Sequence, residues 1–106
     1  GKVRRELVYV DDIAEACIFF MNKKTKETLI NIGRGSDSTI NEYIKIIKKI
    51  ILPNKKFKII YDSSKPNGTH QKLLDISLAK QYGWRPKFDL EKSIRKTYES
   101  YVNTIN

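Results

Sequence analysis

The stretch from Ser64 to Asp75 constrains the fold of this chain most, because it interrupts a regular alternation of strand-like and helical segments. It carries a Pro66-Asn67-Gly68 turn, in which proline fixes one backbone angle and glycine permits left-handed conformations. After residue 61 the connections between elements are too irregular for a doubly wound sheet. We therefore expect an α/β fold in the broad sense, with three or four helices and a few short strands.

Apolar periodicity indicates where those elements lie. Runs rich in β-branched and aromatic residues predict short strands over residues 5–10, 29–33 and 57–61. Apolar residues that recur every three or four positions predict helices over residues 14–21, 40–51, 77–82 and 90–105. The second of these helices has the clearest stripe, with five isoleucines and a tyrosine on one face. Such a face must pack against another element.

Several helix ends carry capping residues. Thr39 and Glu42 form a capping-box pattern at the start of the second helix. Ser77 and Asp89 are the expected N-caps of the third and fourth helices. Gly83 is expected to close the third helix in the left-handed conformation, which glycine adopts without a steric penalty.

The helix over residues 14–21 is apolar on nearly every side, so we expect most of its faces to be buried. Asp12 and Glu15 mark its expected N-terminus. Cys17 is the only cysteine of the chain, which excludes an internal disulfide and a cysteine-built metal site. We expect Cys17 to be a small core residue rather than a nucleophile, because burial disfavours the reactive thiolate.

The formal net charge of +9 comes mainly from 16 lysines, six of which lie between Lys45 and Lys58. A stand-alone module that binds nucleic acid is therefore kept as an alternative. Such modules usually add arginines and exposed aromatic residues to lysine, whereas lysine here accompanies 15 isoleucines as a compositional bias. No apolar run approaches the ~20 residues of a membrane span. We expect a cytoplasmic protein with no nucleic-acid and no membrane partner.

Four charged residues are the candidate ligand contacts. Lys72 and Asp75 follow the turn three positions apart, which suits a ligand with both a phosphate and a vicinal diol, such as a nucleotide or nucleotide sugar. A surface ion pair explains these two residues equally well. Arg5 can fork onto a diphosphate through two parallel hydrogen bonds, with a plain surface charge as the alternative. Lys58, on the third expected strand, is by itself compatible with a solvated side chain.

Three catalytic-looking features are interpreted as coincidences. Gly33–Gly35 follows an expected strand and precedes a helix, but the third glycine of a dinucleotide-binding fingerprint is replaced by Ser38, so we expect turn geometry. Tyr61 and Lys65 match a Tyr-x-x-x-Lys pair, which needs a helix to bring both side chains to one face. His70, the only histidine, has no catalytic partner at a useful spacing. We expect no catalytic residue and no metal site in this chain.

A series of segments runs through nearly the whole chain: Arg4–Ala16, Ile30–Gly35, Thr39–Glu42, Asp62–Asp75, Gly83–Pro86 and Thr97-Tyr98. In these segments the chain resembles the C-terminal portion of the GDP-L-fucose synthases, which are epimerase-reductases of the extended short-chain dehydrogenase family. The Val-Asp-Asp and Gly-Trp-x-Pro pieces are shared by many nucleotide-sugar epimerases and dehydratases. The Ser-Lys-Pro-Asn-Gly-Thr loop followed by Lys-Leu-Leu-Asp points more narrowly to the fucose synthases.

The resemblance implies that residues 1–106 are the smaller, substrate-binding domain of a two-domain enzyme whose Rossmann domain is absent here. It also implies a role for each candidate: a diphosphate contact for Arg5, a second phosphate contact for Lys72, a ribose contact for Asp75 and a position near the substrate for Lys58. The chain departs from the pattern at His70-Gln71, where these enzymes usually have Pro-Arg. One positive charge is therefore missing from that turn.

The same resemblance implies a reaction and its partners. The whole enzyme would epimerise a GDP-sugar, GDP-4-keto-6-deoxy-mannose, at two carbons beside its ketone and reduce it with NADPH to GDP-L-fucose. NADP and the catalytic groups would belong to the missing domain, so we expect no cofactor site and no activity in this piece alone. We expect a homodimer for the whole enzyme and a monomer for this piece. The alternative within this class is a domain of another nucleotide-sugar epimerase or dehydratase.

Overall fold

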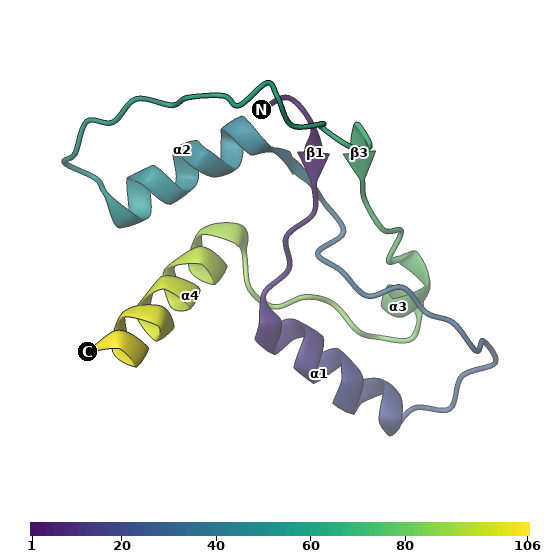
Figure 1. The fold of residues 1–106 in the computed structure, drawn as a ribbon. Coiled ribbons are helices and arrows are strands. Elements are labelled where there is room, and N and C mark those ends of the chain that lie inside the picture. Colours follow the sequence, from purple (N-terminus) through teal and green to yellow (C-terminus); the bar gives the residue numbers. More distant parts are fainter.

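The computed structural model describes all 106 residues and contains four helices and one three-stranded sheet (Figure 1). The elements in chain order are β1 (Arg4–Arg5), α1 (Val10–Met21), β2 (Ser38–Thr39), α2 (Ile40–Ile51), β3 (Gln71–Lys72), α3 (Ser77–Gln81) and α4 (Leu90–Ile105). The expected α/β class, with helices joined to a few short strands, is confirmed.

The strands are shorter than expected, and β2 and β3 lie outside the segments that were predicted to be strands. β1 is the central strand, antiparallel to β2 and parallel to β3. The predictions of strands over residues 29–33 and 57–61 are wrong, and the prediction over 5–10 holds only at Arg5. A strand needs a neighbour to satisfy its backbone groups, and these segments have none within the chain.

The helix ends follow the expected caps at three places. The Thr39 hydroxyl accepts a hydrogen bond from Glu42 N (3.1 Å), and the Glu42 carboxylate accepts one from Thr39 N (2.7 Å), which completes a capping box on α2. Asp89 Oδ1 accepts from Lys92 N (2.8 Å) at the start of α4. Gly83 has a φ of 104° just after α3, in the left-handed region. These local signals mark the starts of α2 and α4 and the end of α3.

The hydrophobic core lies between α1, α3 and the segment that follows α3. Its buried members are Ala16, Ile76, Ala79 and Trp84, and Phe19, Phe20, Ile30 and Ile32 pack around them. The buried Asp12 carboxylate ties the loop before α4 to α1, because it accepts hydrogen bonds from Lys87 N (2.9 Å) and Phe88 N (3.3 Å). These bonds compensate the cost of burying the carboxylate.

The expectation that α1 is buried on most faces is wrong. Its fully buried residues are Asp12 and Ala16, one helical turn apart, whereas Ile18 is 62% and Met21 is 84% exposed. Cys17 is also exposed, so the expectation of a core residue is wrong at that position as well. The buried stripe of α1 is narrow: Phe19 and Phe20 pack partly buried around the core, whereas Ile18 and Met21 point away from it.

The molecule is open rather than closely packed. Its radius of gyration is 16.5 Å, whereas a compact domain of similar length has about 13 Å. One lobe contains α2 and α4, the other contains α1 and α3, and the sheet lies between them (Figure 1). Only eight residues are fully buried, so the core is small for a chain of this length. No helix combines the length and apolarity that crossing a bilayer requires.

Candidate functional site

Arg5 and Lys72 lie side by side in the sheet. They end β1 and β3, and they are paired in register across these parallel strands. Paired residues on neighbouring strands present their side chains to the same face of a sheet, with the strands about 4.8 Å apart. Neither side chain forms an ion pair with an aspartate or a glutamate. The structure therefore brings two of the four candidate residues together as uncompensated positive charges.

The Arg5 guanidinium reaches the Pro66-Asn67-Gly68 turn. Its Nη2 donates to the Asn67 carbonyl (3.2 Å), and its Nη1 donates to the Arg4 carbonyl (2.7 Å). Gly68 has a φ of 71°, and a Cβ at this position would lie 3.4 Å from Arg5 Nη2. The two hydrogen bonds orient the guanidinium and leave its remaining N–H groups available to an anion.

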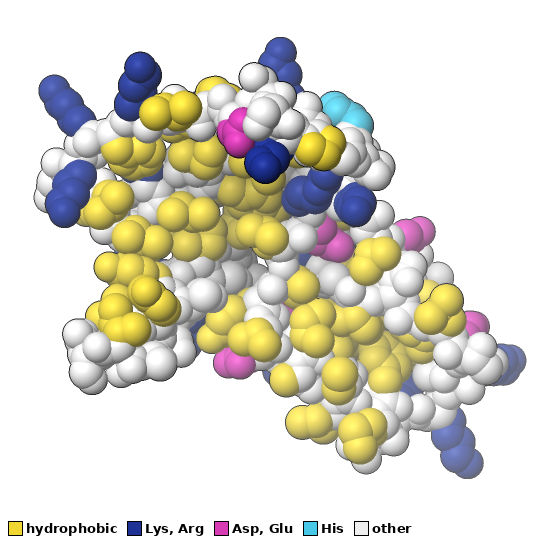
Figure 2. Space-filling model, viewed as in Figure 1, with side chains coloured by type: hydrophobic (Ala, Val, Ile, Leu, Met, Phe, Trp, Pro, Cys, Tyr) yellow, Lys and Arg dark blue, Asp and Glu magenta, His cyan; other side chains and the backbone are white.

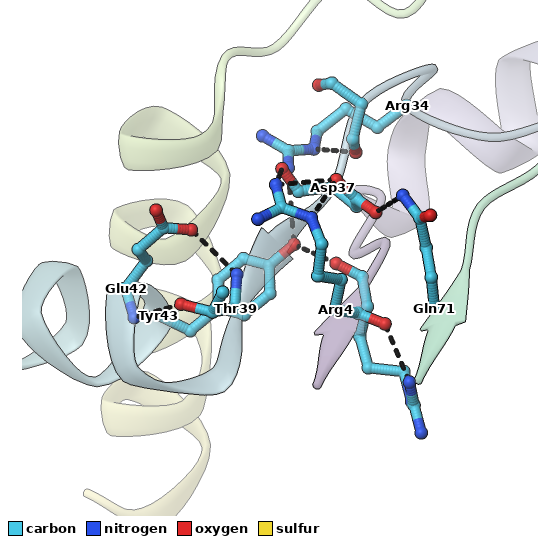
Figure 3. Close-up of polar contacts among 9 residues, drawn as sticks. Arg4, Arg34, Asp37, Thr39, Glu42, Tyr43 and Gln71 are labelled. Atoms are coloured by element: carbon cyan, nitrogen blue, oxygen red, sulfur yellow. Dashed lines mark hydrogen bonds and ion pairs between the residues drawn. The ribbon is translucent and has the colours of Figure 1, made fainter. Parts of the chain in front are cut away.

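A hydrogen-bonded carboxylate joins the strands that carry the two cations (Figure 3). Asp37 Oδ1 accepts from Arg4 Nε (3.0 Å) and Nη2 (2.9 Å), and Asp37 Oδ2 accepts from Gln71 Nε2 (2.6 Å). The hydrogen bonds from Arg4 and from Gln71 hold the pKa of Asp37 below its ordinary value. Arg4 precedes Arg5 and Gln71 precedes Lys72. The Asp37 bridge therefore fixes the spacing of Arg5 and Lys72, which we call the cation pair.

The buried Tyr43 of α2, labelled in Figure 3, holds the backbone of Arg5. Its hydroxyl donates to the Arg5 carbonyl (2.7 Å) and accepts from Arg34 Nη2 (3.2 Å). The sequence placed Tyr43 on the apolar face of its helix but gave no signal for the hydroxyl. That role depends on a contact between residues 38 positions apart, which only the fold reveals.

Glu6 fixes a second turn next to β1. Its Oε2 accepts from Gly35 N (2.7 Å), and its Oε1 accepts from Leu74 N (3.4 Å). Gly35 has a φ of 80°, and a Cβ on Gly33 would lie 2.6 Å from Glu6 Oε1. The interpretation of these glycines as turn geometry is confirmed. Residues 61–65 form no helix, so Tyr61 and Lys65 are not brought to one helical face.

Asp75 lies at the start of α3. Its Oδ1 accepts from Ser77 N (2.9 Å), and this hydrogen bond is the main cause that lowers the pKa of Asp75. The expectation that Ser77 caps this helix is wrong, because Ser77 is its first residue and the N-cap position is Ile76, which has no side-chain cap. Asp75 Oδ2 accepts no hydrogen bond within the chain, which leaves one oxygen for a ligand hydroxyl.

Lys58 has no hydrogen bond or ion pair that links it to Arg5 or Lys72. It lies in the exposed segment between α2 and β3, which runs along α2 in Figure 1. Its side chain forms neither an ion pair nor a hydrogen bond in the chain. The structure thus groups Arg5 with Lys72, places Asp75 a few residues beyond β3, and leaves Lys58 as a separate surface charge.

A polar hollow of about 700 Å³ adjoins the Pro-Asn-Gly turn. Asn41, residues 61–63, Lys65, Asn67 and His70 contribute to its lining. The Tyr61 hydroxyl donates to Asn41 Oδ1 (2.6 Å), which ties the start of α2 to the segment before the turn. Because Asn67 both lines the hollow and contacts Arg5, the hollow and the cation pair are contiguous. Asn41 was not predicted as a site residue, because the sequence showed only that it belongs to the helix over residues 40–51.

Residues 1–33 match the model of the NAD dependent epimerase/dehydratase family. Over its whole length the chain is 42% identical to the GDP-L-colitose synthase of Yersinia pseudotuberculosis, and it covers 34% of that protein. It is 38% identical to the probable GDP-L-fucose synthase 1 of Oryza sativa subsp. japonica, over 99% of this chain and 31% of that protein. The chain is thus similar over its whole length to proteins of the epimerase/dehydratase class. It matches the C-terminal part of these relatives.

A solved structure of an epimerase has the same fold. The UDP-glucose 4-epimerase of Thermotoga maritima with UDP-glucose superposes on this chain with a TM-score of 0.87 and 33% identity, over all of this chain and 34% of that one. The chain therefore spans about one third of the length of the epimerase/dehydratase relatives that it matches. The resemblance seen in the sequence is confirmed for the whole chain.

Proposed function

We propose that this chain is the nucleotide-sugar-binding domain of an NADP-dependent epimerase-reductase that converts GDP-4-keto-6-deoxy-mannose to GDP-L-fucose. The observation that carries the proposal is the in-register pair of Arg5 and Lys72 beside the turn at Asn67. An arginine fork with a neighbouring lysine is suited to the adjacent anionic oxygens of a diphosphate. The similarity to GDP-L-fucose and GDP-L-colitose synthases supports a GDP-sugar as the ligand.

In this proposal each candidate residue holds one part of the ligand. Arg5 and Lys72 bind the diphosphate, and the free oxygen of Asp75 accepts a hydrogen bond from a ribose hydroxyl. Lys58 contributes a more distant positive charge near the substrate. The hollow beside Asn67 gives room for the part of the ligand that extends from the diphosphate. Its volume lies in the range that small-molecule sites occupy, roughly 300–1,000 Å³.

The chemistry in this proposal is divided between two parts of one enzyme. The remainder of the enzyme binds NADP, which supplies the hydride for the reduction. The residues described here hold the nucleotide, and they thereby position the keto-sugar for reaction. This chain alone is then expected to bind substrate without turning it over.

A UDP-sugar 4-epimerase is the second candidate. It is favoured by the TM-score of 0.87 to the Thermotoga maritima epimerase with UDP-glucose. Both candidates use the same diphosphate contacts and differ in the base that they accept. A binding measurement with both nucleotides therefore separates them.

The proposal is tested by titrating the 106-residue chain with GDP, UDP and GMP while its amide NMR signals are recorded. We expect GDP to move the signals of Arg5, Asn67 and Lys72 together, with a Kd near 1 mM, or about 4 kcal/mol. GMP, which lacks the second phosphate, should bind more weakly. Tighter binding of UDP than of GDP would favour the second candidate. Shifts confined to residues 45–58 and larger with DNA would favour a nucleic-acid-binding module instead.

Two charge-matched variants complete this test. Lys72→Gln removes the proposed phosphate contact, whereas Lys92→Gln removes the same charge from α4 in the other part of the molecule. A hydrogen bond to a charged group contributes about 1.5–3 kcal/mol, so Lys72→Gln should weaken GDP binding by about tenfold or more. Lys92→Gln should leave the affinity nearly unchanged. Equal losses in the two variants would mean that net charge alone attracts the nucleotide.

A further inference from the structure

The segment over residues 33–37 holds the chain on both sides of Arg5. Asp37 Oδ1 accepts a hydrogen bond from the guanidinium of the residue before Arg5 (Nη2, 2.9 Å). Gly35 N donates to the carboxylate of the residue after Arg5 (2.7 Å). The same segment reaches Arg5 itself indirectly, through the hydroxyl of Tyr43. Three consecutive residues at and beside β1 are therefore tied to one short segment.

Arg34 is linked to the backbone of Arg5 through the Tyr43 hydroxyl, and Figure 3 labels both Arg34 and Tyr43. Arg34 Nη2 donates to the Tyr43 hydroxyl (3.2 Å), which donates in turn to the Arg5 carbonyl (2.7 Å). A guanidinium carries N–H donors and no acceptor, so the hydroxyl proton cannot point to Arg34. Arg34 thereby fixes the direction in which Tyr43 donates its hydrogen bond.

The link is buried at Tyr43 and oriented at Arg34. Tyr43 is only 4% exposed, so water does not readily replace a hydrogen bond that its hydroxyl loses. Arg34 is half-buried, and its Nε donates to the Ser36 carbonyl (3.1 Å). Arg34 forms no ion pair with an aspartate or a glutamate. Its hydrogen-bond partners, a carbonyl of its own segment and the Tyr43 hydroxyl, hold its guanidinium in place.

The Arg5 carbonyl matters because the Arg5 guanidinium is anchored to the same stretch of backbone. Its Nη1 donates to the carbonyl of the preceding residue (2.7 Å), and its Nη2 donates to the Asn67 carbonyl (3.2 Å). A rotation of the Arg5 peptide group would change the direction of the N–H groups that remain for a diphosphate. It would also change the spacing to Lys72 on the paired strand. Charge-assisted hydrogen bonds to such a group depend on that geometry.

We propose that Arg34 is a positioning residue for the diphosphate contact, acting through the Tyr43 hydroxyl on the backbone of Arg5. The proposal rests on the proposed function, in which Arg5 and Lys72 hold the diphosphate of a nucleotide sugar. The alternative is an action of Arg34 through its own charge, since Figure 2 shows several Lys and Arg side chains together beside β1 and β3. The geometry favours the first role, because the contact of Arg34 leads through Tyr43 to the backbone of Arg5.

A double-mutant cycle separates these two roles. Tyr43→Phe removes the hydroxyl and keeps the buried ring, and Arg34→Met removes the guanidinium. The GDP affinity of the 106-residue chain is measured by NMR titration for the native chain, each single variant and the double variant. We expect each single variant to raise the Kd by about fivefold, the effect of losing one hydrogen bond. The double variant should bind no more weakly than Tyr43→Phe, because both changes break the same link.

Two results of the cycle would overturn the proposal. If the losses of the single variants multiply in the double variant, Arg34 acts on the ligand independently of Tyr43. If Tyr43→Phe binds GDP as tightly as the native chain, the link has no effect on the cation pair. Arg34→Lys, which keeps donors and no acceptor, should recover most of the affinity that Arg34→Met loses.

Tyr82→Phe is the matched control. The Tyr82 hydroxyl also accepts one hydrogen bond, from Lys26 N (3.1 Å), and donates one, to Glu27, but it lies next to α3 and away from the sheet. This variant should lose stability in urea comparably to Tyr43→Phe and leave the Kd for GDP unchanged. An equal loss of affinity in both variants would mean that general destabilisation causes it, and the proposal would fail.

The carbonyl carbon NMR signal of Arg5, recorded without nucleotide, reports on the link directly. Tyr43→Phe and Arg34→Met should both move this signal, whereas Tyr82→Phe should not. An unmoved signal in Arg34→Met would contradict the proposal whether or not the chain binds GDP. A native chain that binds no GDP would instead contradict the proposed function, so the two failures are distinguishable.

Discussion

Gly68 shapes the candidate site through its backbone. Its φ of 71° lies in the left-handed region, which costs a residue with a Cβ about 1–2 kcal/mol. A Cβ would also stand 3.4 Å from Arg5 Nη2. We expect Gly68→Ala to lower the free energy of unfolding by about 1 kcal/mol, measured by urea denaturation, and to weaken GDP binding because the turn no longer holds the guanidinium.

Gly68→Asn is the matched control, since asparagine adopts the left-handed conformation more readily than alanine. It should lose less stability than Gly68→Ala while adding a larger side chain. If both variants lost the same stability, crowding of Arg5 rather than backbone strain would be the cause.

Asp37 makes the stability of the sheet depend on pH. Hydrogen bonds from Arg4 and Gln71 depress its pKa in the folded state, whereas in the unfolded chain it titrates near its ordinary value of about 3.9. A depressed folded pKa stabilises the protein above the unfolded pKa, and this contribution is lost as the pH falls through the folded pKa. Stability should therefore decline below about pH 4.

The measurement is the urea midpoint of the native chain and of Asp37→Asn at several pH values from 6 downward. Asp37→Asn should be less stable at pH 6, and its midpoint should fall less steeply in acid than that of the native chain. Asp62→Asn is a useful comparison, because the pKa of Asp62 is lowered by a local hydrogen bond from Ser64 rather than by a bridge between strands. Identical acid profiles for the native chain and Asp37→Asn would contradict the assignment.

At this scale, the sequence identified residues that stand out by charge but not the residues that position them. Arg5 and Lys72 could be selected because a cation at a strand end or in an unusual loop can be recognised from the sequence alone. Asp37, Tyr43 and Asn41 could not, because their partners lie 20 to 38 positions away in the chain. Their side chains carry no local pattern that distinguishes a bridge between strands from an ordinary surface residue.

Among the elements, α2 is tied to the sheet through its own cap. Thr39 caps α2 and also belongs to β2, where it pairs with Arg4. Thr39→Ala should cost about 1 kcal/mol of stability, the usual loss for an N-cap. Asp89→Ala at the start of α4 should cost a similar amount, because it removes an equivalent cap without a strand. We expect only Thr39→Ala to move the amide NMR signal of Arg5, and a shift in both variants would argue against this coupling.

The helices were predictable and most strands were not, for a physical reason. A helix satisfies its backbone groups locally, so the stripe over residues 40–51 and its capping box suffice to place α2. A strand depends on a neighbour, and residues 29–33 and 57–61 have none in this chain. The expectation that α1 is buried on most faces was wrong for the same kind of reason, because an apolar helix face predicts burial only where another element covers it, and Ile18 and Met21 remain exposed.

The whole molecule carries two surfaces that look unrelated in the sequence, a polar one at the sheet and an apolar groove between α2 and α4. The cation pair and its polar hollow lie at the sheet, and the apolar groove lies between α2 and α4. Residues 4–10 connect them, since Arg5 belongs to the first surface and residues 7–10 line the second. A change in the packing of the groove would therefore reach the segment that leads directly from Arg5.

The proposed function leads to a prediction for the longer polypeptide with the proposed GDP-sugar substrate. Lys72→Gln should raise KM by about tenfold, the equivalent of 1.4 kcal/mol, with a smaller change in kcat, because the proposed role of this lysine is to bind the diphosphate equally in the ground and transition states. Lys58→Gln removes the same charge from a side chain without contacts to the pair, so its KM should change less. Steady-state kinetics of the two variants measure both effects. A loss confined to kcat in Lys72→Gln would instead place that lysine at the reacting sugar.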